Sequence, residues 1–150
     1  MPALPPYAHI DLPTTQCIEQ AAQRYSVPEL LIHSILLTEN GRTGQCSKNT
    51  NGTIDCGLAQ INSVHFSSLS QKYGIAPAQV VHDPCTNVYV STYLLKSFQI
   101  RFNDWTQAII AYNVGPNTKN PQRYAIGVNY ARKVISRWHQ LHSFSQGHKK

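Results

Sequence analysis

The spacing of apolar residues predicts a chain built mostly from helices. Residues 14–25, TTQCIEQAAQRY, carry their apolar positions at helical intervals, and residues 29–39 are apolar nearly all round, as in a helix buried in a core. Further helical patterns cover residues 64–74, 84–102, 105–114 and about 123–139. We therefore predict a mainly α fold, with a short extra turn of helix around the sequence AQV.

The ends of these helices are marked by polar residues and glycines. Ser26 followed by Glu29 has the spacing of a capping box for the second helix. The residues expected to cap the later helices are Ser63, Asp83 and Asp104. Asn40-Gly41 is expected to end the second helix, and Gly74 and Gly115 to end later ones.

One segment between the second and third helices has a different pattern. Residues 41–57 are rich in Asn, Thr and Gly, and Asn51-Gly52 is typical of a hairpin tip. We predict a small β-hairpin here, which makes the fold α+β rather than purely helical. Residues 1–13 hold four of the nine prolines and are expected to form an extended arm. Residues 14–138 then form one domain, and 139–150 a flexible basic tail.

Composition limits the class of protein. A chain of 150 residues with 41% hydrophobic and 13% charged residues is long enough for one domain with its own core. Its longest apolar run is only a few residues, so no membrane span is expected. The net charge of +6 fits either simple solubility or an anionic polymer as partner. Nucleic acid is disfavoured, because the basic residues form no stripe interleaved with aromatics.

Four cysteines, Cys17, Cys46, Cys56 and Cys85, indicate an oxidising compartment. No Cys-x-x-Cys pair and no histidine at finger spacing is present, which argues against zinc, and we expect no metal or other cofactor. Three disulfide pairings are possible, and four reduced thiols are a further alternative. We favour Cys46 with Cys56, which staples a short segment and leaves Cys17 with Cys85.

The first residues, MPALPPYAHIDLP, lack the basic start and apolar core of a signal peptide. Disulfides require an oxidising compartment, and this conflicts with the lack of an export signal in these residues. We expect that a signal was removed and that Met1 is an added start.

Glu39 is the candidate for acid catalysis. It lies on the same helical face as Ile32, Ile35 and Leu36, next to an open Gly-rich segment. Partial burial disfavours the charged carboxylate and raises its pKa, as a general acid requires near neutral pH. A glutamate at a helix end is nevertheless often solvated, so position alone leaves both interpretations open.

Four motifs in order add a resemblance. TENG followed by NTNGTIDCGLAQIN resembles the catalytic core of the lysozyme-like superfamily, and AIIAYNVG at 108–115 resembles a motif of the soluble lytic transglycosylase family. Tyr124-Ala125 and Tyr130-Ala131 resemble its Y-A-x-x-V ending. An early cysteine and D-P-C-x-N, here residues 83–87, resemble the small cell-wall-opening transglycosylases of secretion, conjugation and pilus systems. The resemblance covers about residues 14–138 and implies a lysozyme-like α+β fold.

The resemblance also implies roles for single residues. Glu39 is expected to be the catalytic acid/base, and Gln60 to line the cleft beside the reacting sugar. Tyr112 is expected to point its hydroxyl toward the acid, and Asn113 to support that turn. Ser47 and Asn49 are both candidates for the family's hydroxyl-bearing serine. Two departures from the pattern are Ala59, where Met is common, and Asn40, where Ser is common.

The expected function is therefore a peptidoglycan lytic transglycosylase. Such an enzyme cleaves the bond between N-acetylmuramic acid and N-acetylglucosamine to give 1,6-anhydromuramyl products, with one protein carboxylate. The expected partners are peptidoglycan strands and components of an envelope-spanning secretion, conjugation or pilus apparatus. The protein is expected to be a periplasmic monomer that opens the cell wall locally.

Two alternatives differ in mechanism. NTNGTIDCG also resembles the animal lysozyme segment whose hairpin Asp faces the catalytic Glu, and Asp55 falls at that place. A two-carboxylate hydrolase is then possible, although an Asp before a turn commonly bonds to its local backbone. We favour the lyase, with Asp55 as a structural residue. A non-catalytic peptidoglycan-binding module is disfavoured because Glu39, Gln60 and Tyr112 occur together. His33, Trp105 and Trp138 are expected in the core.

Overall fold

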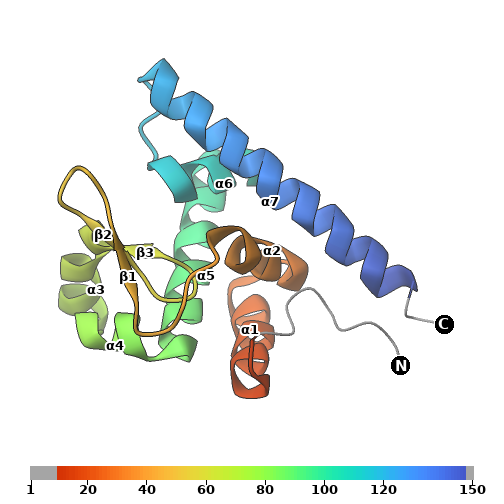
Figure 1. Cartoon of the computed structure of the whole chain (residues 1–150), viewed down its shortest axis with the longest axis horizontal. Helices are drawn as coiled ribbons and strands as arrows, with labels where there is room; N and C mark the ends of the chain where they lie inside the picture. The colour runs from red at the N-terminus through yellow and green to blue at the C-terminus, as the bar shows by residue number, and fades with distance from the viewer. Residues whose placement is uncertain (1–9, 148–150) are drawn as a thin grey trace.

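A computed structural model describes residues 10–147 of the chain (Figure 1). This part holds seven α-helices, three short strands and one 3-10 turn. In chain order the elements are α1 Leu12–Tyr25, α2 Glu29–Glu39, β1 Cys46–Lys48, β2 Ile54–Cys56, β3 Ile61–Asn62, η1 Ser63–His65, α3 Phe66–Tyr73, α4 Pro77–His82, α5 Pro84–Phe102, α6 Trp105–Val114 and α7 Pro121–Gly147. The mainly α prediction, with its β excursion between the second and third helices, is confirmed.

Helix α2 lies in the core and packs mainly on α7 and also on α1. Figure 1 shows α7 running as one long rod beside α2 and α6, while α1 and the sheet lie toward the other side. Helix α5 packs on both α1 and α6. Residues 31–36 of α2 are all buried, which explains why this helix is apolar nearly all round. No helix within residues 10–147 is long and apolar enough to cross a membrane.

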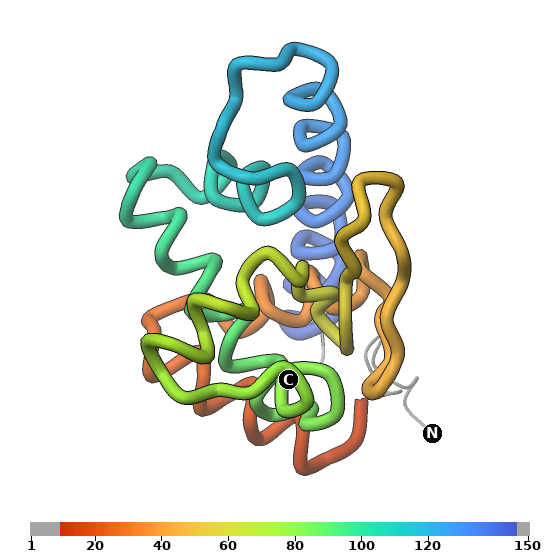
Figure 2. The backbone as a smooth tube through the Cα atoms, turned by 90° about the vertical axis from the view of Figure 1, so that its left-hand side faces the viewer, coloured from red at the N-terminus to blue at the C-terminus, as the bar shows by residue number. Residues whose placement is uncertain are grey.

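The sheet is a three-stranded antiparallel meander in the order β1-β2-β3, and its β1–β2 hairpin projects from the body (Figure 2). Its register places Asp55 opposite Ser47 on one side and Asn62 on the other. The β1–β2 hairpin was predicted from composition. The third strand was not, because its residues belong to the GLAQIN motif interpreted as a turn.

Both disulfides have the predicted pairing. Cys17–Cys85 joins α1 to the first turn of α5, with a sequence separation of 68 residues. Cys46–Cys56 joins directly opposed residues of β1 and β2. The first bond therefore ties distant helices together, and the second fixes the register of the hairpin.

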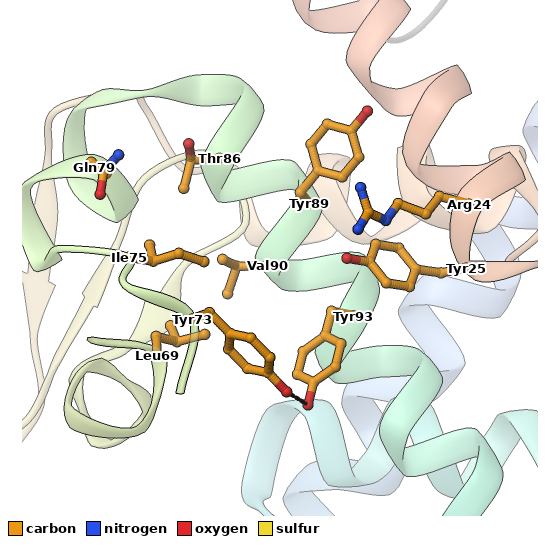
Figure 3. Close-up of a pocket in the computed structure, with 10 residues that line it drawn as sticks. All are labelled: Arg24, Tyr25, Leu69, Tyr73, Ile75, Gln79, Thr86, Tyr89, Val90 and Tyr93. Carbon is orange, nitrogen blue, oxygen red and sulfur yellow. Dashed lines mark hydrogen bonds between the residues drawn. The ribbon is translucent and has the colours of Figure 1, made fainter. Parts of the chain in front are cut away.

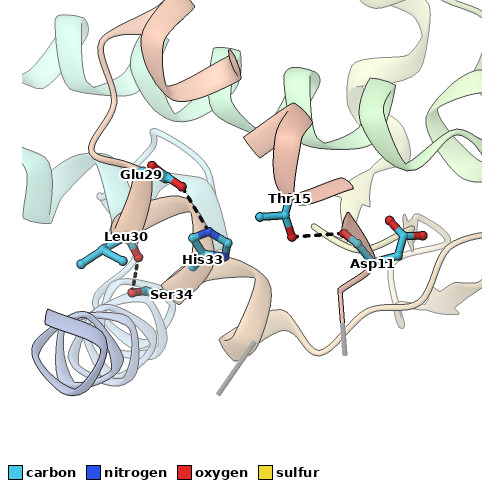
Figure 4. Close-up of polar contacts among 6 residues, drawn as sticks. All are labelled: Asp11, Thr15, Glu29, Leu30, His33 and Ser34. Atoms are coloured by element: carbon cyan, nitrogen blue, oxygen red, sulfur yellow. Dashed lines mark hydrogen bonds and ion pairs between the residues drawn. The ribbon is translucent and has the colours of Figure 1, made fainter. Parts of the chain in front are cut away.

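Helices α1 and α7 extend into the segments that were predicted as the arm and the tail. Helix α1 begins at Leu12, because Asp11 caps it: the Asp11 carboxylate accepts from the Thr14 amide. The Asp11 carbonyl also accepts from the Thr15 hydroxyl (Figure 4). The rest of the predicted arm, residues 1–9, lies outside the described residues. Helix α7 continues to Gly147, since Leu141 is buried. Up to residue 147 the predicted tail is therefore helical.

The caps follow the local signals in two of four cases. Asp83 and Asp104 cap α5 and α6 as predicted. Ser26 does not cap α2; it ends α1 in the left-handed conformation, and Pro28 precedes α2 without a side-chain cap. Ser63 does not cap the third helix either. Asn62 accepts from the Val64 amide instead, and the Ser63 hydroxyl accepts from the Ile54 amide.

The remaining core predictions are confirmed. His33 is 1% exposed, and burial lowers the pKa of its imidazole to about 4, so the ring is neutral at physiological pH. Its Nε2 lies 3.8 Å from Glu29 Oε1, and Figure 4 shows the two side chains in contact. Trp105 and Trp138 are partly buried and pack against the core, and Trp138 also stacks on His142.

Candidate active site

A cleft of about 840 Å³ separates the sheet from helices α5, α6 and α7. Glu39 lies in it at the end of α2, and Asp55 lines it from β2. Its lining therefore comes from both the sheet region and the helices. The lining residues used below are Glu39, Lys48, Asn49, Asp55, Gln60, Asn62, His65, Tyr112, Asn113, Val114, Arg123 and Ile126.

The backbone after Glu39 explains how the helix end reaches this cleft. Asn40 adopts a left-handed conformation with φ of 54° and ends α2, and its amide donates to the Leu36 carbonyl. At Gly41 a Cβ would overlap the carbonyls of Gly57 and Leu58. Only glycine therefore allows the end of α2 to pack directly on the 57–60 turn.

The surroundings of Glu39 raise the pKa of its carboxyl to near neutrality. Burial raises its pKa to about 7, and the negative charge of Asp55 adds to this rise. The Tyr130 hydroxyl donates to Glu39 Oε2 at 2.6 Å and acts in the opposite direction. The balance leaves Glu39 able to donate a proton near neutral pH and to accept one back, as a general acid/base requires.

The hydroxyl that hydrogen-bonds to Glu39 is not that of Tyr112, although the charge of Glu39 also acts on the Tyr112 phenol. It belongs to Tyr130 of α7, whereas the Tyr112 hydroxyl donates to the Ala59 carbonyl at 2.8 Å. Burial raises the pKa of both phenols, so both remain donors. The Tyr130-Ala131 pair was a visible signal, but nothing local in the sequence placed it on Glu39. Asn113 is exposed and lines the cleft beside Tyr112.

Gln60 lines the cleft from the turn before β3. Its side-chain amide donates to the Gly57 carbonyl at 3.0 Å, and its Oε1 accepts from the Ser47 hydroxyl at 2.6 Å. Of the two serine-position candidates, Ser47 therefore contacts the turn, while Asn49 contacts Asp55. Ala59 is fully buried in this turn.

Asn87 is a supporting residue that sequence reasoning missed. Its amide nitrogen donates to the carbonyls of Cys56 and Val80, and its Oδ1 accepts from the Ala59 amide. The side chain is 1% exposed, so it replaces backbone partners that the 57–60 turn lacks. Its position as the last residue of D-P-C-x-N was the available signal.

Asp55 is held in place by two amides. Asn62 donates to its Oδ1 at 2.9 Å and Asn49 to its Oδ2 at 3.0 Å. These neutral donors satisfy both oxygens of the carboxylate at the wall of the cleft. The structure thus brings Glu39 and Asp55 to one cleft, with Asp55 bonded to side chains of the sheet region.

A second hollow, of about 500 Å³, lies between α1, α3, α4 and α5. Figure 3 shows four tyrosines around it, with Arg24 at one side and the hydroxyls of Tyr73 and Tyr93 bonded to each other. No carboxylate lines it. Within residues 10–147 no group of His, Cys, Asp or Glu could hold a metal ion. The cleft at Glu39 is accordingly the candidate active site.

A mainly helical domain with a small antiparallel sheet, and a partly buried glutamate at a helix end facing that sheet across a cleft, defines the lysozyme-like class. Within this class the chain belongs to the transglycosylase SLT domain family, whose model matches residues 16–134. Membership supports a lytic transglycosylase-type function and implies a peptidoglycan substrate.

Curated relatives extend along most of the chain. It is 32% identical over 130 residues to the invasion protein IagB of Salmonella typhimurium, covering 86% of this chain and 79% of that protein. It is 28% identical over 123 residues to protein IpgF of Shigella flexneri, covering 81% and 78%. An X polypeptide of Escherichia coli is 33% identical over 105 residues, covering 67% and 60%.

Proposed function

We propose that this protein is a peptidoglycan lytic transglycosylase that cleaves the β-1,4 bond between N-acetylmuramic acid and N-acetylglucosamine. The observation that supports it most is the Glu39 carboxyl, which is partly buried at the cleft, has a pKa of about 7 and bonds to Tyr130. No second carboxylate is needed when the substrate itself supplies the nucleophile.

The reaction balances with Glu39 alone. Protonated Glu39 gives its proton to the glycosidic oxygen, and the bond from that oxygen to the anomeric carbon of the muramic residue breaks. The 6-hydroxyl oxygen of the same residue then bonds to the anomeric carbon, and its proton passes to the Glu39 carboxylate. The product is a 1,6-anhydromuramyl end, water is not consumed, and Glu39 is protonated again.

The neighbouring residues have supporting roles in this proposal. Tyr130 orients Glu39 and stabilises its carboxylate while the proton is absent, since a hydrogen bond to the charged form favours it. Gln60 faces the sugar from the 57–60 turn, which Ser47 and Tyr112 hold through Gln60 and Ala59. Asn113 and Asn49 offer further amide contacts to the glycan along the cleft.

A two-carboxylate hydrolase is the second candidate. It is favoured by one observation, that Asp55 lines the same cleft and that its charge acts on the Glu39 pKa. We prefer the lyase, because both Asp55 oxygens already accept from asparagine amides, as expected for a carboxylate that organises the sheet.

The cellular role follows the enzyme class. Two disulfides fit an exported protein, and we place it in the periplasm as a monomer that opens the wall locally for an envelope-spanning secretion, conjugation or pilus apparatus. The similarity to an invasion protein supports an assembly of this kind.

Mass analysis of products from purified peptidoglycan separates these functions. Anhydromuramyl ends are expected from the lyase, and each such end is lighter by one water than the reducing end that a hydrolase leaves. Reducing ends from the parent protein would instead identify a muramidase. Release of no glycan by protein that is folded and oxidised would leave only a binding module.

A further inference from the structure

Arg123, like Lys48, is a cation of the cleft lining that the proposed reaction does not use. It lies in the first turn of α7, and its Nε donates to the Val114 carbonyl at 2.8 Å. This bond fixes one edge of the guanidinium while the side chain lines the cleft. Within residues 10–147 no carboxylate forms a salt bridge with it. The terminal nitrogens of Arg123 are therefore available to an anion from outside the chain.

The position of Arg123 relative to Glu39 follows from the helix it shares with Tyr130. The two residues are seven positions apart, or ~10 Å along the axis of α7, and both lie on the side toward the cleft. Ile126, which is 62% exposed, lies between them on the same side. Arg123 is thus removed from the proton transfer, and Glu39 owes its raised pKa to burial and Asp55.

The charge distribution of the cleft is uneven. Burial lowers the pKa of His65, so its ring is neutral at physiological pH. The formal cations of the lining are then Lys48, on the hairpin side, and Arg123, on the α7 side. On the α7 side a single guanidinium, partly fixed by a backbone carbonyl, stands beside an exposed isoleucine.

We propose that Arg123 is a specificity-determining residue that binds a carboxylate attached to the glycan, with Ile126 contacting the apolar part of the same substituent. This inference rests on the proposed function and deepens it. N-acetylated sugar rings carry no charge, so the anion must come from what they bear. A guanidinium with two free terminal nitrogens matches a carboxylate in a bidentate geometry.

Two sources offer this carboxylate, and substrates can separate them. In strands with stem peptides, the muramic lactyl carboxyl is consumed in an amide, so the charge lies on the peptide. In peptide-free strands the lactyl carboxylate is free. Peptide-free strands whose lactyl groups are converted to methylamides have no carboxylate at all.

The test compares kcat and KM for the parent, Arg123→Gln, Arg123→Lys and the control Arg132→Gln on these three substrates. Arg132 is exposed on the same helix and does not line the cleft. We expect Arg123→Gln to raise KM about tenfold on at least one carboxylate-bearing substrate, with kcat and the pH profile unchanged. Arg123→Lys should recover part of the loss, and added salt should raise the parent KM more than that of Arg123→Gln.

The pattern across substrates decides the outcome. An effect on stem-bearing strands assigns the peptide as the source, and an effect restricted to peptide-free strands assigns the lactyl group. An equal KM increase on the methylamide strands, or a lowered kcat with a shifted pH profile, would overturn the proposal in favour of a structural role for the Val114 contact. If the parent cleaves but Arg123→Gln matches Arg132→Gln, only this inference fails. If the parent cleaves none of the three substrates, the proposed function fails too.

Discussion

At the scale of single residues, the Glu39 carboxyl depends on opposing influences. Burial and the charge of Asp55 raise its pKa, while the Tyr130 hydroxyl lowers it, and the balance lies near neutrality. A proton donor must be protonated before it acts. We therefore expect activity to fall as the pH rises through about 7, which a pH–rate profile on peptidoglycan would measure.

Glu39→Gln is expected to abolish cleavage while stabilising the fold at alkaline pH. Below about pH 4.5 Glu39 is neutral in both states and imposes no cost. As the pH rises from there to about 7, the unfolded state ionises first and stability falls. The variant removes this penalty, which is about 3 kcal/mol. Urea unfolding at pH 4 and 8 would measure this difference. An equal change in the free energy of unfolding at both pH values would show that the pKa of Glu39 is not raised in the folded protein.

Tyr130→Phe should move the alkaline limit of activity to higher pH. The hydroxyl lowers the pKa of Glu39, so its loss lets that pKa rise further. Turnover should also fall by about tenfold, because the carboxylate formed during the reaction loses a charge-assisted hydrogen bond. The pH dependence of kcat is the measurement.

Tyr112→Phe is the matched control for this change. Its hydroxyl bonds to the Ala59 carbonyl rather than to Glu39, so the variant should lose about 1 kcal/mol of stability. The alkaline limit should stay where it is. A shift in the Tyr112 variant but none in the Tyr130 variant would return the orienting role to Tyr112.

The contrast between these residues shows what sequence could predict. Glu39 was identified from a local pattern, because its helical neighbours determine its burial. Tyr130 bonds to it across 91 positions, and no local rule specifies which face of α7 meets the end of α2. Asn87 was missed for the same reason, since its partners are backbone groups of a turn about thirty residues earlier.

At the scale of elements, the success of a cap prediction depended on competing partners. Asp83 and Asp104 had no nearby rival and cap their helices. Ser63 has a competing residue, because Asn62 precedes it and takes the capping position. The Ser63 hydroxyl instead accepts a hydrogen bond from the Ile54 amide of β2. Helix α7 was predicted too short, since the burial of Leu141 depends on tertiary packing rather than on the polar sequence around it.

The sheet supplies the test for Asp55. Asparagine keeps one acceptor oxygen but directs an NH₂ group toward one of the two amide donors from Asn49 and Asn62. We expect Asp55→Asn to cost about 1 kcal/mol and to retain most activity, with anhydromuramyl products. Thermal unfolding and product mass analysis would measure both. A folded variant as inactive as Glu39→Gln, with reducing ends from the parent, would make Asp55 a catalytic carboxylate.

At the scale of the whole molecule, Cys17–Cys85 connects the first helix to the longest internal one. It closes a loop with a sequence separation of 68 residues. In the chain-entropy model, removing a disulfide that closes such a loop lowers the free energy of unfolding by about 4 kcal/mol, which corresponds to a fall in Tm of roughly 10 °C. We expect the Cys17→Ala/Cys85→Ala pair to show this loss in calorimetry, with kcat little changed in what remains folded.

The hairpin disulfide provides the comparison for that measurement. Cys46–Cys56 closes a separation of only 10 residues, so the same model gives a smaller stability loss for its removal. Its loss should instead reduce turnover, because Ser47 and Gln60 depend on the hairpin register. Equal effects of the two pairs on both Tm and kcat would contradict this division.

The shared face of α7 restricts how related sequences can change in length. Arg123 and Ile126 line the cleft, and Tyr130 contacts Glu39 from the same side of α7, because spacings of three, four and seven residues keep them on one helix face. One inserted residue between positions 123 and 130 would rotate everything before it by ~100° and turn Arg123 away from the cleft. Insertions and deletions are therefore expected to accumulate in the loop at residues 116–120, and the stretch from 123 to 130 is expected to keep its length even where its residue types differ.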